Sequence, residues 1–143
     1  MILDFVLLAD AASMAEGKLH VHGGAITRFN VPQFPFHVPT VAIVIRMILE
    51  EGDVGRERTI ALDWFRDGEP IPPVSIEGPI QPNPPLVAVE GEEVSAIVVA
   101  TVNGLPLDEP GLYELVVRLD GEVISRKPVP AVRVEDVLPA PDQ

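Results

Sequence analysis

Residues 110–124 read PGLYELVVRLDGEVI, and this stretch decides the fold class. Alternate positions along it are apolar and share one face, a pattern typical of a half-buried strand: Tyr113, Leu115, Val117 and Leu119. Asp120-Gly121 is typical of a two-residue turn, and it predicts a returning strand with Val117 opposite Ile124. The stretch therefore predicts an antiparallel hairpin in an all-β chain.

Strand patterns recur along the rest of the chain. They cover residues 3–9, 18–29, 41–49, 58–65, 94–102 and 129–134. Residues 41–49 and 58–65 are expected to pair as a hairpin, and Gly23-Gly24 to form a bulge that brings Ile26 to the core side. The best helical candidate is residues 10–16, a connector of one or two turns that Asp10 would cap.

These segments predict an all-β fold of seven or eight strands. Short strands separated by turn signals, without helices to cover a parallel sheet, favour a two-sheet antiparallel sandwich, immunoglobulin-like or C2-like. A closed barrel is the alternative. Tyr113 follows Pro110-Gly111 at the start of a late strand, where immunoglobulin-like sandwiches place their tyrosine corner.

We expect residues 1–134 to form a single β-sandwich domain. Seven of the sixteen prolines lie between Asp67 and Leu86, and proline cannot donate to a sheet ladder. Residues 67–86 are therefore predicted to be a proline-rich crossover between the sheets, with room for a short edge strand at residues 73–76. Residues 135–143 are expected to be a flexible acidic tail.

Composition excludes several classes of partner. The 143 residues carry a net charge of −12, which argues against nucleic acid and against an anionic membrane surface. No apolar run is long enough to cross a bilayer. The absence of cysteine excludes thiol nucleophiles and zinc–thiolate sites. It also fits a reducing compartment, and the opening lacks the basic start of a secretory signal, so a cytoplasmic location is expected.

The candidate metal ligands are His20 and His22. Two histidines at i and i+2 on a strand point the same way, and His37 or a carboxylate would supply a third ligand of a metal-binding enzyme or sensor. The alternative, which we adopt, places both on a solvated face opposite Leu19 and Val21. No metal or other cofactor is then expected. The serines lack a Gly-x-Ser-x-Gly setting, so we expect no enzymatic activity.

One feature predicts a protein partner. Two strands, residues 41–49 and 94–102, are apolar on both faces, whereas a two-layer sandwich buries one face of each sheet. The interface candidates are Val44, Ile48, Ile97 and Val99. Either another part of the chain covers them, or a second copy does so as a two-fold dimer. A carbohydrate or small-ligand module is a further alternative, but Trp64 and Tyr113 both fall on predicted core faces.

Three groups of residues resemble a bacterial family of small all-β proteins that is classed as a domain of unknown function. They are Leu8-Ala9-Asp10-Ala11-Ala12, the run from Gly17 to Gly24, and the prolines at 32, 35 and 39. The closing Pro-Gly-x-Tyr strand and Asp-Gly hairpin are similar too. The resemblance implies an all-β sandwich with no assigned activity, and it supplies no catalytic residues.

Overall fold

The structure, a computed structural model, describes residues 1–80, 87 and 89–137, without the side chains of residues 70–75. It contains ten strands. Their bounds are β1 Ile2–Ala9, β2 Ala11–Ala15, β3 Lys18–His22, β4 Phe29–Val31, β5 Phe36–Ile48, β6 Arg58–Arg66, β7 Glu69–Ile80, β8 Ser95–Leu107, β9 Gly111–Leu119 and β10 Glu122–Arg133. One short 3₁₀ turn, η1 Val134–Asp136, follows β10, and the described residues contain no α-helix.

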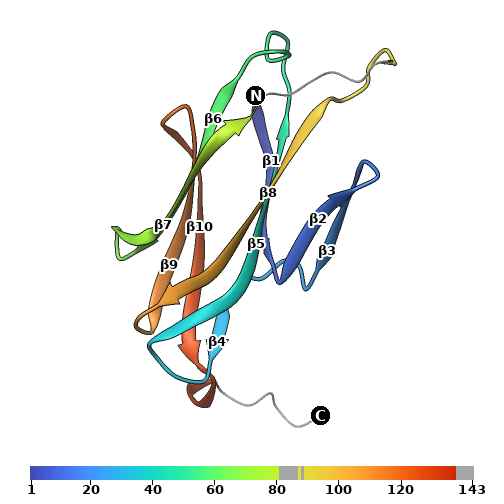
Figure 1. Cartoon of the computed structure of the whole chain (residues 1–143). Coiled ribbons are helices and arrows are strands. Elements are labelled where there is room, and N and C mark those ends of the chain that lie inside the picture. Colours follow the sequence, from blue (N-terminus) through green and yellow to red (C-terminus); the bar gives the residue numbers. More distant parts are fainter. Residues whose placement is uncertain (81–86, 88, 138–143) are drawn as a thin grey trace.

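The strands form three sheets (Figure 1). A three-stranded sheet has the order β1-β5-β8, a five-stranded sheet the order β4-β10-β9-β6-β7, and β2 pairs with β3 alone. Neighbours are antiparallel except β10 and β4, which run parallel. The predicted all-β class is confirmed. The prediction of seven or eight strands is wrong, because residues 10–31 contribute three short strands instead of a connector and one long strand.

One hydrophobic core contains buried residues from both of the larger sheets. Both sheets contribute fully buried side chains to it, among them Ile43 and Met47 from β5 and Trp64 from β6. The predicted core face of residues 110–124 is confirmed, since the four residues of that face are all buried: Tyr113, Leu115, Val117 and Leu119. Ile26 also packs against this core, as predicted.

The hairpin of β9 and β10 turns at Asp120-Gly121, whose φ angles are 51° and 83°. Positive φ at both positions is what a tight hairpin turn requires. The predicted register is wrong by one residue beyond the turn. A bulge between Val123 and Ser125 sets Val117 opposite Ser125 and leaves Ile124 as the extra residue.

Residues 10–16 are not helical. Ala11–Ala15 is the strand β2, which pairs with β3 across a turn where Glu16 and Gly17 have φ angles of 54° and 73°. The hairpin therefore satisfies its backbone groups by cross-strand pairing. The strand predicted over residues 18–29 ends at His22, because Gly23 turns the chain with φ 57°, and a Cβ there would lie 2.1 Å from an Asp10 carboxylate oxygen.

The expected hairpin of residues 41–49 with 58–65 is also wrong. β5 pairs with β1 and β8, whereas β6 pairs with β7 and β9 in the other large sheet. Residues 49–57 therefore pass from one sheet to the other. The buried Asp53 in this connection accepts hydrogen bonds from the backbone N–H of Glu50 at 2.7 Å and from Arg58 at 3.3 Å.

The first part of the proline-rich segment is a longer strand than expected. β7 spans Glu69–Ile80 and forms the edge of the five-stranded sheet beside β6. An edge position suits prolines, because their missing N–H costs no ladder bond when it faces away from the neighbour. Residues 81–86 of the predicted crossover and residues 138–143 of the predicted tail lie outside the described residues.

Candidate interaction surface

The strand β8 has one partner and one free edge. All of β8, from Ser95 to Leu107, pairs with β5. No strand and no backbone hydrogen bond joins the other edge of β8 in the described part of the chain. Alternate residues of an antiparallel edge strand direct N–H and C=O groups away from the sheet. From Val94 to Leu107 the sequence contains no charged residue, and Pro106 is the only proline. A long uncharged edge of this kind is the type that pairs with other chains.

The facing edge, β7, differs in composition. It has prolines at positions 70, 72, 73 and 79, and acidic residues at Glu69 and Glu77. Prolines and charges are the usual devices that protect an edge from pairing. The β7 edge is therefore protected against pairing with another strand, whereas the β8 edge is open to it.

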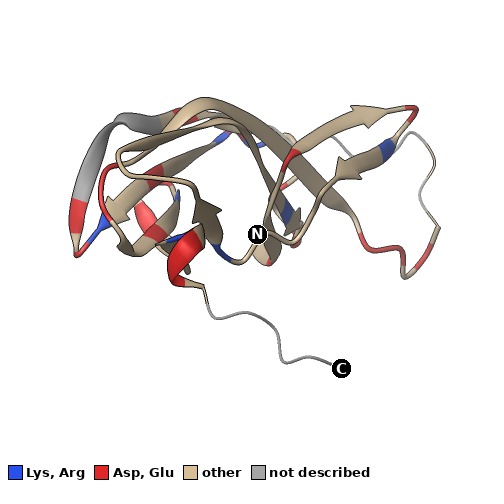
Figure 2. Ribbon diagram, turned by 90° about the horizontal axis from the view of Figure 1, so that it is seen from below, with Lys and Arg blue, Asp and Glu red and all other residues tan. Residues whose placement is uncertain are grey.

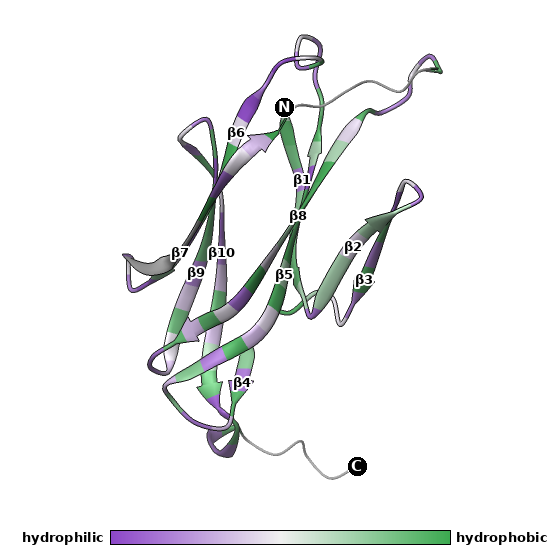
Figure 3. Cartoon of the chain, in the orientation of Figure 1, coloured by the Kyte–Doolittle hydropathy of each residue, from purple (hydrophilic) through white to green (hydrophobic). Residues whose placement is uncertain are grey.

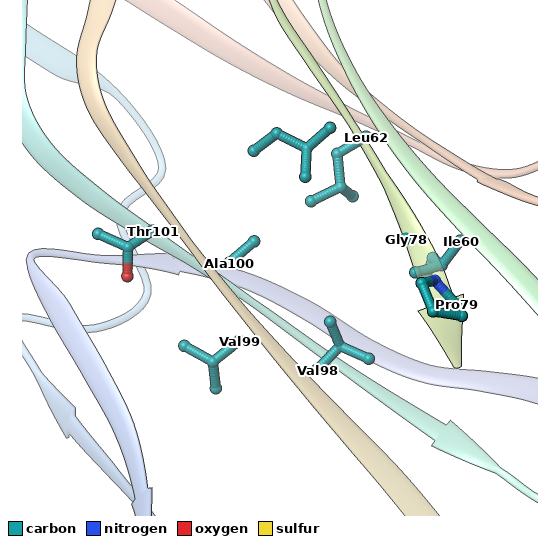
Figure 4. A pocket seen from close by; sticks show the side chains of 9 residues that line it. Ile60, Leu62, Gly78, Pro79, Val98, Val99, Ala100 and Thr101 are labelled. Atoms are coloured by element: carbon teal, nitrogen blue, oxygen red, sulfur yellow. The ribbon is translucent and has the colours of Figure 1, made fainter. Parts of the chain in front are cut away.

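A groove of about 280 Å³ lies between these two edges (Figure 4). Val98 and Ala100 point into it from β8, whereas Val99 and Thr101 point away. The opposite wall comes from β6 and β7: Ile60, Leu62, Ile76, Gly78 and Pro79. Gly78 has nothing within 4 Å of its Cβ position, so the β7 wall is low there and the groove opens toward solvent.

The predicted interface residues lie on the outer face of the three-stranded sheet, whose strands are rich in hydrophobic residues (Figure 3). Val44 is fully buried, whereas Ile48, Ile97 and Val99 are half-buried. We use the term β8 surface for the accessible part of the free edge, residues 95–101, together with the side chains of these three half-buried residues. Val44 is not accessible and is not part of it.

The β2–β3 hairpin lies near the outer face of the three-stranded sheet. β2 lies against both β5 and β8. The apolar face of the hairpin includes Ala12 and Leu19, which are half-buried, and Met14, whose exposure is 46%. An N-terminal segment thus lies near part of the outer face, one of the two alternatives that the sequence left open, and Ile48, Ile97 and Val99 remain half-buried among the described residues.

Acidic residues lie at both ends of β8. Glu90, Glu92 and Glu93 precede the strand, and Asp108 and Glu109 follow it; all five are exposed. Figure 2 shows acidic residues at several turns and loop ends and also on some strands. The strand β8 itself is therefore an uncharged segment between two acidic ends, and the neighbouring Arg46 lies opposite its Ile97.

Arg46 is the one cation on the outer face of β5. Its guanidinium pairs with Asp4 and, at 3.1 Å, with Glu93. The hydrogen bond to Asp4 raises the pKa of Arg46 above its ordinary value. Both bonds tie β1 and the segment before β8 to β5, so this arginine is already engaged within the chain.

The three histidines that were candidate metal ligands are not brought together as one cluster. His20 and His22 are exposed on β3, on the same face as Ser13, and His37 is exposed on β5 opposite Pro106. Among the described residues, no group of three or more histidines and carboxylates is arranged to hold a metal ion. Trp64 and Tyr113 are buried, as the sequence predicted.

Sequence reasoning named Ile97 and Val99 but missed the groove. Its lining comes from strands of two sheets, and the pairing of each strand was needed to place them side by side. The signal that the sequence did contain was the uncharged run of residues 94–107 between acidic residues.

No described helix is long and apolar enough to span a bilayer.

Comparison with known proteins gives one family. The model of a family of unknown function (DUF6941) matches residues 4–132. No individual curated protein matches the chain.

Proposed function

The chain belongs to the family of unknown function DUF6941, and we propose that it is a non-enzymatic protein-interaction module that acts through the β8 surface. The single observation that carries the proposal is the uncharged edge of β8, which has no strand partner in the described part of the chain and is accessible over residues 95–101, where each residue is half-buried or exposed. Such an edge offers unpaired backbone donors and acceptors to another strand. The absence of cysteine supports a cytoplasmic location for this function.

The finer fold proposed for the module is an immunoglobulin-like two-sheet sandwich. Support comes from the shared core between the three-stranded and five-stranded sheets. The hydroxyl of Tyr113 supports it further, because it donates to the backbone carbonyl of Glu109 at 2.8 Å, the bond that defines a tyrosine corner.

Two properties of the β8 surface make it suited to binding. Its side chains Ile48, Ile97 and Val99 are half-buried, so part of their apolar area remains exposed to water. Burying apolar area contributes about 25 cal/mol per Å². A partner strand would add main-chain hydrogen bonds to that gain, and the partner is either a second copy of the chain or another protein.

A concentration series by light scattering tests the proposal, together with recovery of partners from native lysate. The variant Val99→Lys places a charge on the β8 surface. The matched control is Val123→Lys on β10 in the five-stranded sheet, where Val123 is 37% exposed. We expect Val99→Lys to abolish self-association or partner recovery while Val123→Lys retains it. A strictly monomeric chain without a Val99-dependent partner would contradict the proposal.

A further inference from the structure

We propose that the β8 surface takes an extended polypeptide segment, uncharged in its middle and flanked by lysine or arginine, as an added strand beside β8. This inference rests on the proposed function and names the partner of that same surface. Three observations carry it: the free edge, the groove beside it, and the acidic ends of the strand.

The free edge sets the conformation of the partner. Only an extended segment can meet the alternate N–H and C=O groups that β8 directs away from β5. The opposite side of the groove cannot supply a full second ladder, because β7 has four prolines without N–H groups. The partner strand therefore pairs with β8 and packs beside β7.

The groove determines which side chains the middle of the partner segment carries. Side chains on one face of an added strand would enter the groove of about 280 Å³, whose walls include Leu62, Ile76 and Val98. None of the side chains that line it is charged. Apolar residues at alternate positions of the partner fit this lining, because successive side chains of a strand point to opposite faces.

The acidic residues at both ends of β8 determine the charge of the residues at the two ends of the partner segment. Glu90 and Glu92 before the strand, and Asp108 after it, form no ion pair with a cation in the described part of the chain. Lysine or arginine at both ends of the segment would meet these carboxylates. The partner is thus complementary in charge as well as in shape.

The same charges argue against a second copy as the occupant. In a symmetric antiparallel pairing of two full β8 strands, the residues before one strand lie opposite those after the other. The acidic residues 90–93 of each copy would then lie near Asp108 and Glu109 of the other, and although Glu93 and Glu109 each have an arginine partner, this concentration of like charge destabilises a strand pair. Each copy also carries a net charge of −12.

Two synthetic peptides test the inference with the full chain, by fluorescence anisotropy. Both contain the same core of alternating valine and threonine; one has two lysines at each end and the other two glutamates. We expect the lysine-flanked peptide to bind about tenfold more tightly at about 20 mM salt, and the difference to shrink at about 0.5 M, where surface charges are screened.

Backbone methylation tests the pairing itself. N-methyl groups on alternate residues block one edge of a peptide strand. Methylation of one alternate set should abolish binding, and methylation of the other set should leave it unchanged. Equal loss from both sets would overturn strand addition.

The variant Glu90→Lys/Asp108→Lys tests the acidic ends, with Glu122→Lys on β10 as the control. We expect the double variant to lose the preference for the lysine-flanked peptide and the control to keep it. Equal affinity of the native chain for both peptides, or no binding of either, would overturn the inference. If neither peptide binds but self-association depends on Val99, the proposed function stands and a second copy is the occupant; if neither effect is seen, both fail.

Discussion

The indole N–H of Trp64 on β6 donates a buried hydrogen bond to the backbone carbonyl of Pro106 on β8, with a donor–acceptor distance of 3.3 Å. It joins the two larger sheets through the core, close to the C-terminal end of β8. We predict that Trp64→Phe lowers the free energy of unfolding by about 1–3 kcal/mol, because the carbonyl loses its donor and a smaller ring leaves a cavity. Urea denaturation followed by circular dichroism measures this change, and an unchanged midpoint would contradict it.

Tyr113 stabilises the turn that leads from β8 into β9. Its hydroxyl donates to the carbonyl of Glu109 at 2.8 Å and accepts from the N–H of the same residue at 3.3 Å. We expect Tyr113→Phe to lower the free energy of unfolding by about 1–2 kcal/mol, because the ring stays packed on Trp64 while both backbone groups lose a partner. Thermal unfolding is the measurement, and the far-ultraviolet circular dichroism spectrum should keep its native form.

Acid should weaken the connection between β5 and β6. The hydrogen bond from the Met1 ammonium, followed by that from the Glu50 N–H, lowers the pKa of Asp53 below its ordinary value of 3.8. A lowered pKa means that this stabilisation is complete above pH 3.8 and is lost as the pH falls through the folded-state pKa. Asp53→Asn should therefore lower the Tm at neutral pH and make its fall in acid shallower.

The measurement for Asp53 is the Tm between about pH 2 and pH 7. The control is Glu57→Gln, at an exposed position in the same connection, which should follow the native curve. A Glu57→Gln curve that matched Asp53→Asn would show that general charge, and not the contacts of Asp53, sets the acid response.

A charged substitution at Val44 should destabilise the fold, unlike one at an exposed position of the same sheet. Val44 is fully buried within the three-stranded sheet, where it lies opposite Val99. We predict that Val44→Asp costs at least about 3 kcal/mol of folding free energy, because it buries an unpaired carboxylate. Thr101→Asp, at an exposed position on β8, should remain folded. Solubility and chemical denaturation compare the two variants.

The histidines test the alternative of a metal centre. His20 and His22 are exposed on β3, so His20→Ala/His22→Ala should leave the free energy of unfolding unchanged to within about 0.5 kcal/mol. We expect elemental analysis of the purified chain to find no stoichiometric zinc, iron, nickel or manganese. A stoichiometric metal that disappears in the double variant would instead establish the metal-binding alternative.

Local rules predicted some features correctly. The alternation of residues 113–119 identified a buried face, and Asp120-Gly121 identified a turn whose positive φ angles the structure contains. The same rules failed for residues 10–16, where alanines and a capping aspartate favoured a helix. There, pairing with β3 outweighs a weak intrinsic preference, since short helices are marginal without packing.

By itself, the sequence determined the all-β class, the closing turn and the core face of β9, because each depends on neighbours within a few residues. The tertiary structure alone decided that β5 pairs with β1 and β8 rather than β6, that a bulge shifts β10, and that β8 keeps a free edge beside a groove. An alternating strand fits many partners equally well. The choice among them depends on which contacts between distant segments bury the most apolar surface in one core.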